Sequence, residues 1–248
     1  IEGCNGVLLT APSAVLEQSA GVASAAGPVG ASAVRIADDQ WMSIKDAGCH
    51  QLGKDGADFS LSMWLKASPG TSQIIGTTSQ YGREQGFILH TNPLASGDME
   101  LQLSSFADGS SATVKSAPFA PDTWTHVVLR YDANDSAPTA SLDVNLQQTA
   151  GSAAPNVYND RLRVGDQGYG NIAPFDVSEL RSYQRLLTDS EVRALFVEKS
   201  EAVGVSTTEV SEALDRIQGH VDGGSPLAAA DLASAAQRFS HSSVPVSY

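Results

Sequence analysis

Residues 124–132 form the run Trp-Thr-His-Val-Val-Leu-Arg-Tyr-Asp, which constrains the fold more than any other stretch of the chain. β-Branched and aromatic residues of this kind fit a half-buried pleated surface and suit a helix poorly. The run ends in an Asp-Ala-Asn-Asp turn cluster, and a second alternating run follows at 142–146. This pattern predicts two strands of an antiparallel sheet.

Further short strands are predicted from about residue 33 to residue 183. The clearest is 59–66, where Phe, Leu, Met and Leu alternate with Ser, Ser, Trp and Lys and so define two faces. Turn sequences such as Ser-Pro-Gly at 68–70 and Ser-Gly-Asp at 96–98 separate the strands. Many short strands without interleaved helices indicate an all-β fold, an antiparallel sandwich or jelly roll.

The pattern becomes helical at Thr188. Residues 188–191, Thr-Asp-Ser-Glu, have the form of a capping box, and apolar residues at helical spacing follow at 192–196. Further helices are expected near 206–221 and 225–239, the first with an apolar stripe at 210, 214, 217 and 221. We therefore predict an extended lead-in (1–32), a jelly-roll domain (33–196) and a small helical C-terminal extension (197–248).

The chain is acidic, with 28 acidic and 15 basic residues and a net charge of −13. This balance argues against nucleic acid and anionic membrane surfaces as partners. It is consistent with a soluble, self-repelling surface, or with carboxylates that bind Ca²⁺. No segment reaches the roughly eighteen consecutive apolar residues of a membrane span. Because the chain begins at Ile1, we expect a processed product or a piece of a longer polypeptide.

Two features predict an oxidising, extracellular compartment. Cys4 and Cys49 permit one disulfide, which would contribute roughly 4 kcal/mol by the chain-entropy model, although two unrelated buried thiols are the alternative. Asn134, in the sequon Asn-Asp-Ser, is a glycosylation candidate because it lies in a predicted turn.

The sequence lacks the usual patterns of catalytic residues. Glycoside hydrolases of related sandwich folds carry alternating carboxylates on one strand, whereas Asp143 stands alone between Leu142 and Val144. The five histidines include no His-x-x-x-His pair, and no Gly-x-Ser-x-Gly or phosphate-binding glycine loop is present. His126 is interpreted as a packed strand residue in preference to a general base. These observations predict a chain that is not an enzyme, and a polysaccharide-acting enzyme is the weaker alternative.

Six segments resemble, in the correct order, the strands of laminin-G-like (concanavalin A-like) jelly-roll domains. Residues 59–66 are similar to the family strand FTVSAWVK, and 124–132 to WTHVAVTYDG. The other matching segments are 33–44, 86–89, 162–165 and 179–188. The family includes laminin-G, pentraxin and thrombospondin N-terminal domains, which bind glycans, proteins or matrix, often with Ca²⁺. The resemblance therefore implies a binding domain over about 33–196.

The resemblance also suggests where a cation and a ligand would bind. Asp38, Asp39 and Asp176 lie near loops where relatives hold Ca²⁺, but Ser178 replaces an Asp that precedes the closing strand in the family. The candidate ligand contacts are Trp41, as an aromatic platform, together with Asp166, Gln167 and Tyr169 of a glycine-rich loop. An ordinary glycine-rich turn is the alternative for that loop.

Two further expectations concern packing. Trp64 and Trp124 are expected in the core, because the matching strands of the family are core strands. The family hairpin Val-Asn-Gly appears here as Val144-Asn145-Leu146. Without glycine, a tight turn requires Asn145 in the left-handed region, or the turn must move.

We therefore predict a non-catalytic recognition or adhesion module of a larger secreted or cell-surface protein, which binds a glycan or an extracellular protein. The alternative is a structural module that packs within an extracellular complex, filament or matrix. The apolar stripe of 210–221 favours this alternative, because further domains of the same polypeptide or an assembly partner would have to cover it.

Overall fold

A computed structural model describes residues 7–8, 17–18, 23–28, 31–37, 40–45, 52–77, 85–107, 110–133, 137–155, 157, 161–165 and 173–200. The chain divides into two units, Ile1–Val192 and Arg193–Tyr248, and helix α1 (Asp189–Ser200) runs from the first into the second. The helices expected beyond residue 200, both cysteines and Asn134 lie outside the described residues.

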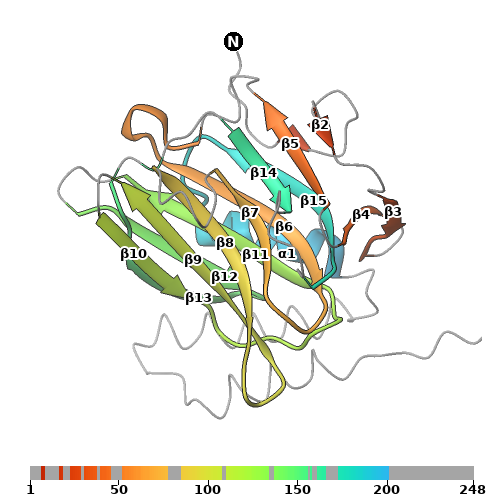
Figure 1. Cartoon of the computed structure of the whole chain (residues 1–248). Coiled ribbons are helices and arrows are strands. Elements are labelled where there is room, and N and C mark those ends of the chain that lie inside the picture. Colours follow the sequence, from red (N-terminus) through yellow and green to blue (C-terminus); the bar gives the residue numbers. More distant parts are fainter. Residues whose placement is uncertain are drawn as a thin grey trace, which may run out of the picture. The chain divides into compact units, whose positions relative to one another are not determined.

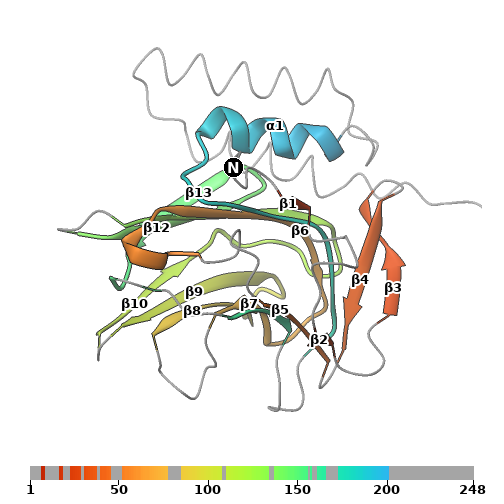
Figure 2. The same ribbon diagram turned by 90° about the horizontal axis from the view of Figure 1, so that it is seen from above.

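Two antiparallel sheets form the first unit, and Figures 1 and 2 show them as two layers. Sheet A has the order β13 (Gln147–Ser152), β12 (Thr139–Val144), β11 (Thr125–Asp132), β6 (Phe59–Ala67), β15 (Phe175–Tyr183), β4 (Ser32–Ile36) and β3 (Ala23–Ala26), with β1 (Val7–Leu8) also paired to β15. Sheet B has the order β10 (Ser110–Lys115), β9 (Met99–Ala107), β8 (Gly86–Pro93), β7 (Ser72–Gly76), β14 (Arg161–Gly165), β5 (Trp41–Lys45) and β2 (Glu17–Gln18).

The core lies between the sheets, as the alternation predicts. In β6 the inward residues Phe59, Leu61, Met63 and Leu65 are at most 1% exposed and belong to one apolar cluster with residues of sheet B. The Phe59 ring stacks on Phe87 of β8, with ring centroids 5.4 Å apart. These contacts confirm the predicted all-β jelly-roll sandwich.

The expected lead-in, residues 1–32, contributes strands to both sheets. β1 pairs with β15 and β3 pairs with β4 in sheet A, whereas β2 pairs with β5 in sheet B. These strands are two to four residues long and are held in the sheets by antiparallel pairing with β15, β5 and β4.

The capping box at the start of α1 is confirmed. The Glu191 backbone N–H donates to Thr188 Oγ1 at 3.3 Å, and the Thr188 N–H donates to Glu191 Oε2 at 2.8 Å. This reciprocal pair satisfies two backbone donors and fixes the first turn.

Of the two tryptophans expected in the core, Trp64 is buried and Trp124 is not. Trp64 is 4% exposed but lies on the outer face of sheet A, where its ring centroid is 5.2 Å from that of His126. Trp124 is half-buried and immediately precedes β11. The expectation was wrong for Trp124, because this residue precedes the strand and does not lie within it. His126, 1% exposed, is packed as interpreted.

The β12–β13 hairpin turns tightly at Asn145 and Leu146. Both residues are left-handed, with φ of 47° and 67°, and Val144 pairs with Gln147 across the turn. Asn145 suits this conformation, and its Oδ1 accepts the His126 N–H at 2.9 Å. Leu146 does not suit this conformation, because a bulky side chain disfavours positive φ.

Replacing Leu146 with glycine is therefore expected to stabilise the fold. The left-handed conformation costs a non-glycine residue about 1–2 kcal/mol, and the greater freedom of glycine in the unfolded chain offsets part of the gain. We expect L146G to raise the free energy of unfolding in urea by about 0.5–1 kcal/mol. L146A, which keeps the Cβ, serves as control and should show no gain. A loss of stability in L146G would mean that the leucine side chain contributes more than its backbone costs.

Candidate binding face

The outer faces of the two sheets differ in exposure. On sheet A the outward side chains of Ser60, Trp64, His126, Val128 and Asp143 are buried, and none is more than 5% exposed. On sheet B several outward side chains of β8, β9 and β10 are half-buried or exposed. Among the described residues, strands β8–β10 of sheet B therefore present more accessible polar side chains than the centre of sheet A.

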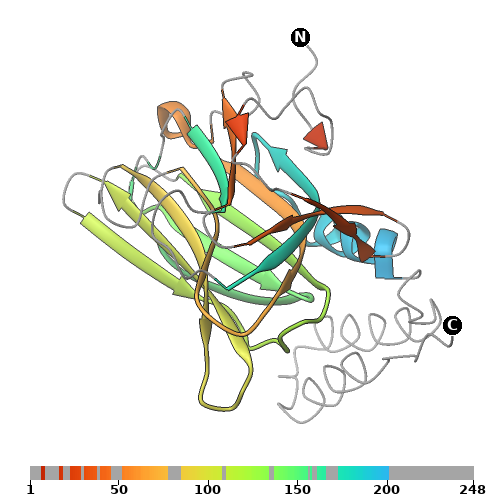
Figure 3. The same cartoon turned by 45° about the vertical axis from the view of Figure 1, so that its right-hand side comes forward.

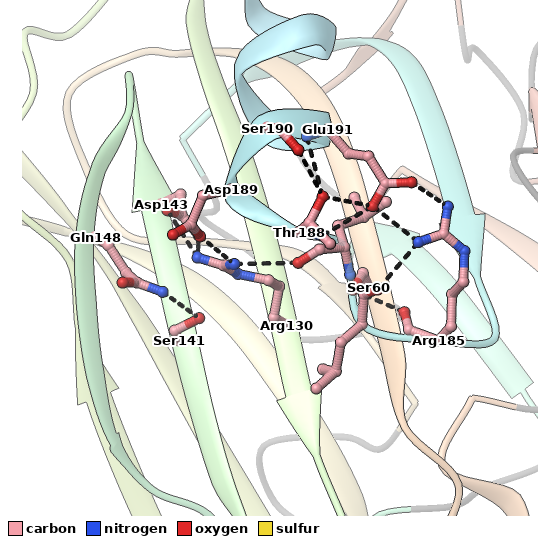
Figure 4. A network of polar contacts seen from close by, with 12 residues as sticks. Ser60, Arg130, Ser141, Asp143, Gln148, Arg185, Thr188, Asp189, Ser190 and Glu191 are labelled. Atoms are coloured by element: carbon pink, nitrogen blue, oxygen red, sulfur yellow. Dashed lines mark hydrogen bonds and ion pairs between the residues drawn. The ribbon is translucent and has the colours of Figure 1, made fainter. Parts of the chain in front are cut away.

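Arg130 organises polar contacts on the outer face of sheet A (Figure 4). Its Nη1 donates to the Leu187 carbonyl oxygen at 3.1 Å and to Asp189 Oδ1 at 2.7 Å. Its Nη2 lies 3.2 Å from Asp143 Oδ1 and 3.1 Å from Oδ2. Burial nevertheless raises the pKa of Asp143, because loss of hydration outweighs the attraction of Arg130.

Ser60 holds the same segment from β6. Its hydroxyl donates to the Arg185 carbonyl oxygen at 2.9 Å and accepts the Leu187 N–H at 3.0 Å. Arg185 forms a two-pronged pair with Glu191, at 2.6 and 2.9 Å (Figure 4). Hydrogen bonds from Arg185, and then from Thr188, lower the pKa of Glu191 to about 2. The segment before α1 therefore occupies part of the outer face of sheet A.

The polar outer face of sheet B follows from strict alternation in β9. Met99, Leu101 and Leu103 are buried in the core, which places Glu100 and Gln102 on the opposite face. Strands β8 and β9 run side by side as a long hairpin, drawn in yellow in Figure 3.

Three side chains on this face form a hydrogen-bonded row, here called the amide ladder: Asn92, Gln102 and Ser104. Asn92 Nδ2 donates to Gln102 Oε1 at 3.1 Å, and Gln102 Nε2 donates to Ser104 Oγ at 3.3 Å. Beside the ladder, Lys115 Nζ pairs with Glu100 Oε1 at 2.6 Å. Asn92 and Gln102 are half-buried, so their remaining donors and acceptors face a partly open surface.

Two buried polar atoms on this face have no hydrogen-bond partner within the described part of the chain: Gln73 Oε1 and His90 Nδ1. Gln73, 6% exposed, lies directly opposite His90 in the β7–β8 register. Buried polar groups are nearly always satisfied, so a water or a ligand group is expected between them.

Burial lowers the pKa of His90, while Glu100 raises it and Lys115 lowers it further. The imidazole is therefore neutral at pH 7.

We expect K115M to raise the His90 pKa and E100Q to lower it, as measured by NMR titration of the ring protons. A folded-state pKa below the unfolded value means that this residue's contribution to stability is present above pH 6.5 and is lost as the pH falls through the folded pKa. A lowered His90 pKa in K115M, or a raised one in E100Q, would contradict these electrostatic assignments.

Among the predicted ligand contacts, the structure describes Trp41 alone. Trp41 begins β5, is half-buried, and pairs with Gly165, the residue immediately before the predicted contact loop. Asp166, Gln167 and Tyr169 lie outside the described residues, so their role remains a prediction.

The calcium prediction is likewise only partly placed. Asp176 is 5% exposed, and its Oδ1 pairs with Arg35 Nη1 at 3.2 Å. The guanidinium already balances the charge of this carboxylate. This pairing does not fit the role of a calcium ligand. Ser178, the family departure, donates its hydroxyl to the Ser32 carbonyl oxygen at 2.8 Å. Asp38 and Asp39 are not among the described residues, and the described ones contain no cluster of three or more potential metal ligands.

Sequence reasoning missed the amide ladder and the pair Gln73–His90. A signal existed in β9, where Glu100, Gln102 and Ser104 alternate with apolar residues and so mark a polar outer face. Which strands lie beside β9, and hence which polar groups meet, was not visible in that pattern.

Residues 34–193 match the family model of the concanavalin A-like lectin/glucanases superfamily. The chain belongs to this superfamily. The match covers most of the sandwich and agrees with the laminin-G-like resemblance of the six segments. A search of curated proteins found no match for this superfamily member.

Solved structures with a similar fold include toxin binding domains. The binding domain of Paraclostridial Mosquitocidal Protein 1 has a TM-score of 0.58 at 14% identity, covering 77% of this chain and 52% of that one. The Botulinum Neurotoxin Type G receptor binding domain has a TM-score of 0.58 at 8% identity, covering 80% and 52%. A third structure concerns botulinum neurotoxin type C, whose cell entry is dependent upon interaction with two ganglioside molecules. It has a TM-score of 0.54 at 9% identity, covering 74% of this chain and 46% of that one. The chain thus spans about half the length of these neighbours, and the likeness shows the shared fold.

Within the described residues, no helix combines the length and apolar content needed to cross a membrane.

Proposed function

We propose that the chain is a non-catalytic binding module of a larger extracellular protein, and that it takes a glycan on the outer face of sheet B. The observation that carries the proposal is the contrast between the two outer faces. At the centre of sheet A the outward residues Ser60, Trp64, His126, Val128 and Asp143 are buried, whereas Asn92, Gln102 and other polar side chains of β8–β10 in sheet B are half-buried or exposed. Rigid strands that present polar groups to solvent suit recognition.

The carboxylate content of this face supports binding over hydrolysis. Strands β5, β7–β10 and β14 contain a single carboxylate, Glu100, which Lys115 holds at 2.6 Å, and the edge strand β2 adds Glu17 at the other end of the sheet. Glycoside hydrolysis ordinarily needs two carboxyl groups about 5–9.5 Å apart across the sugar bond. The solved neighbours named as receptor or ganglioside binders also favour a binding module that works outside the cell.

A glycan array, run with calcium and with a chelator, tests the proposal. We expect selective binding of a subset of glycans and no release of reducing sugar from those bound. Binding that survives the chelator would assign recognition to the protein groups of sheet B, whereas its loss would support a calcium site at the loops. A chain that binds no glycan and elutes as an oligomer in size-exclusion chromatography would contradict the proposal and favour the assembly alternative.

A further inference from the structure

Phe106 is an aromatic residue on the outer face of sheet B, on which Ile88 of β8, 2% exposed, also lies. It is half-buried, and the residues directly opposite it are Gly86 on β8 and Ser111 on β10. Both neighbours are too small to cover an aromatic ring. Phe106 also lies two residues beyond Ser104, the end of the amide ladder, on the same face of β9.

We propose that Phe106 and the amide ladder form a subsite for a neutral oligosaccharide, a proposal that rests on the function proposed above. One sugar ring packs its apolar C–H face against the Phe106 ring, and its neighbour presents hydroxyl groups to the ladder. An aromatic ring offers a flat apolar surface with a partial negative charge, which suits the C–H face of a pyranose.

The ladder has hydrogen-bonding capacity left for such a ligand. Its internal bonds use one Asn92 N–H, one Gln102 N–H and single lone pairs on Gln102 and Ser104. Asn92 Oδ1 and a second N–H on each amide are left over by these two bonds, whereas Ser104, 8% exposed, ends the ladder as a buried acceptor. Adjacent sugar hydroxyls both donate and accept, as this set requires.

The charge balance of the subsite selects a neutral ligand. In β8, β9 and β10 the charged side chains are Glu100 and Lys115, which pair with each other, and His90 is neutral because burial lowers its pKa. No described residue of these strands offers an unpaired cation to a sulfate or carboxylate. The net charge of −13 also disfavours polyanions at a distance.

The spacing of the subsite sets a minimum ligand length. Gln102 and Phe106 are four residues apart on β9, which corresponds to about 13 Å along an antiparallel strand. A single pyranose cannot reach both residues. The subsite therefore requires an oligosaccharide that lies along the strand.

Isothermal titration calorimetry with defined sugars tests the subsite. The probes are tetrasaccharides of β-1,4-linked glucose and β-1,4-linked N-acetylglucosamine, the matching monosaccharides, and a heparin tetrasaccharide. We expect at least one neutral tetrasaccharide to bind at least tenfold more tightly than its monosaccharide and than heparin. F106A and F106L should each weaken that binding at least tenfold, whereas F106W should keep it within threefold.

The ladder and the control complete the design. Q102A should weaken the same binding about fivefold or more, whereas Q148A, which removes an exposed amide on sheet A, should change it less than twofold. Neutral-sugar binding that is indifferent to Phe106 and Gln102 would overturn the subsite but leave the proposed function standing. Preferential binding of heparin would overturn the neutral ligand class. If none of the probes binds and the glycan array is also blank, both proposals fail.

Discussion

Replacement of Arg130 by methionine is expected to lower the free energy of unfolding by about 3–5 kcal/mol, the range measured when one member of a buried ion pair is removed. The side chains of Arg130 and Asp143 are 11% and 6% exposed. Without the guanidinium, Asp143 would remain as an uncompensated buried carboxylate, and the Leu187 carbonyl and Asp189 would lose their shared donor. Chemical denaturation followed by tryptophan fluorescence measures the loss.

The double variant R130M/D143L separates the charge effect from the packing effect. Apolar replacement of both partners is often neutral or stabilising, so the double variant should recover most of the stability lost in R130M. The R130M deficit should also shrink as the pH falls, because burial raises the pKa of Asp143 and protonation removes the unpaired charge. A double variant as unstable as R130M would show that Arg130 acts through its contacts to Leu187 and Asp189.

Gly165→Ala is expected to destabilise the fold by about 2–4 kcal/mol, combining left-handed backbone strain with steric overlap. Gly165 has φ of 81°, at the point where β14 pairs with the start of β5. A Cβ there would overlap the Gln40 carbonyl oxygen and lie 2.8 Å from Ile36 Cγ2. The backbone oxygen cannot move aside without disturbing the β5–β14 pairing.

Gly97→Ala provides the matched control. Gly97 has φ of 92°, but a Cβ there would meet nothing within 4 Å. Its cost should be about 1 kcal/mol, from backbone strain alone. Insoluble G165A beside soluble G97A would support the account, as would a measured gap of about 2 kcal/mol. Equal losses in the two variants would show that the strand junction relaxes around the added methyl group.

The sequence predicted the strands whose apolar residues alternate. The expected segments 59–66 and 124–132 correspond to β6 (Phe59–Ala67) and β11 (Thr125–Asp132). The capping box at Thr188 located the start of α1 for the same kind of reason, because the signal is local.

Elements without a local apolar signal were missed. β13, Gln-Gln-Thr-Ala-Gly-Ser, is an edge strand with half-buried and exposed residues, and its place depends on pairing with β12. The candidate site was harder still to predict. The pair Gln73–His90 and the half-buried Phe106 ring depend on which strands lie side by side, and none of these residues carries a sequence signal by itself.

We place ligand binding on the outer face of sheet B. The most direct measurement is an NMR titration of the ¹⁵N-labelled chain with the tightest-binding glycan of the array. The account predicts that chemical-shift changes gather on β8, β9 and β10, with the Asn92 and Gln102 side-chain amides among the largest. Changes that gather on sheet A or at the segment before α1, with β8–β10 unaffected, would contradict it.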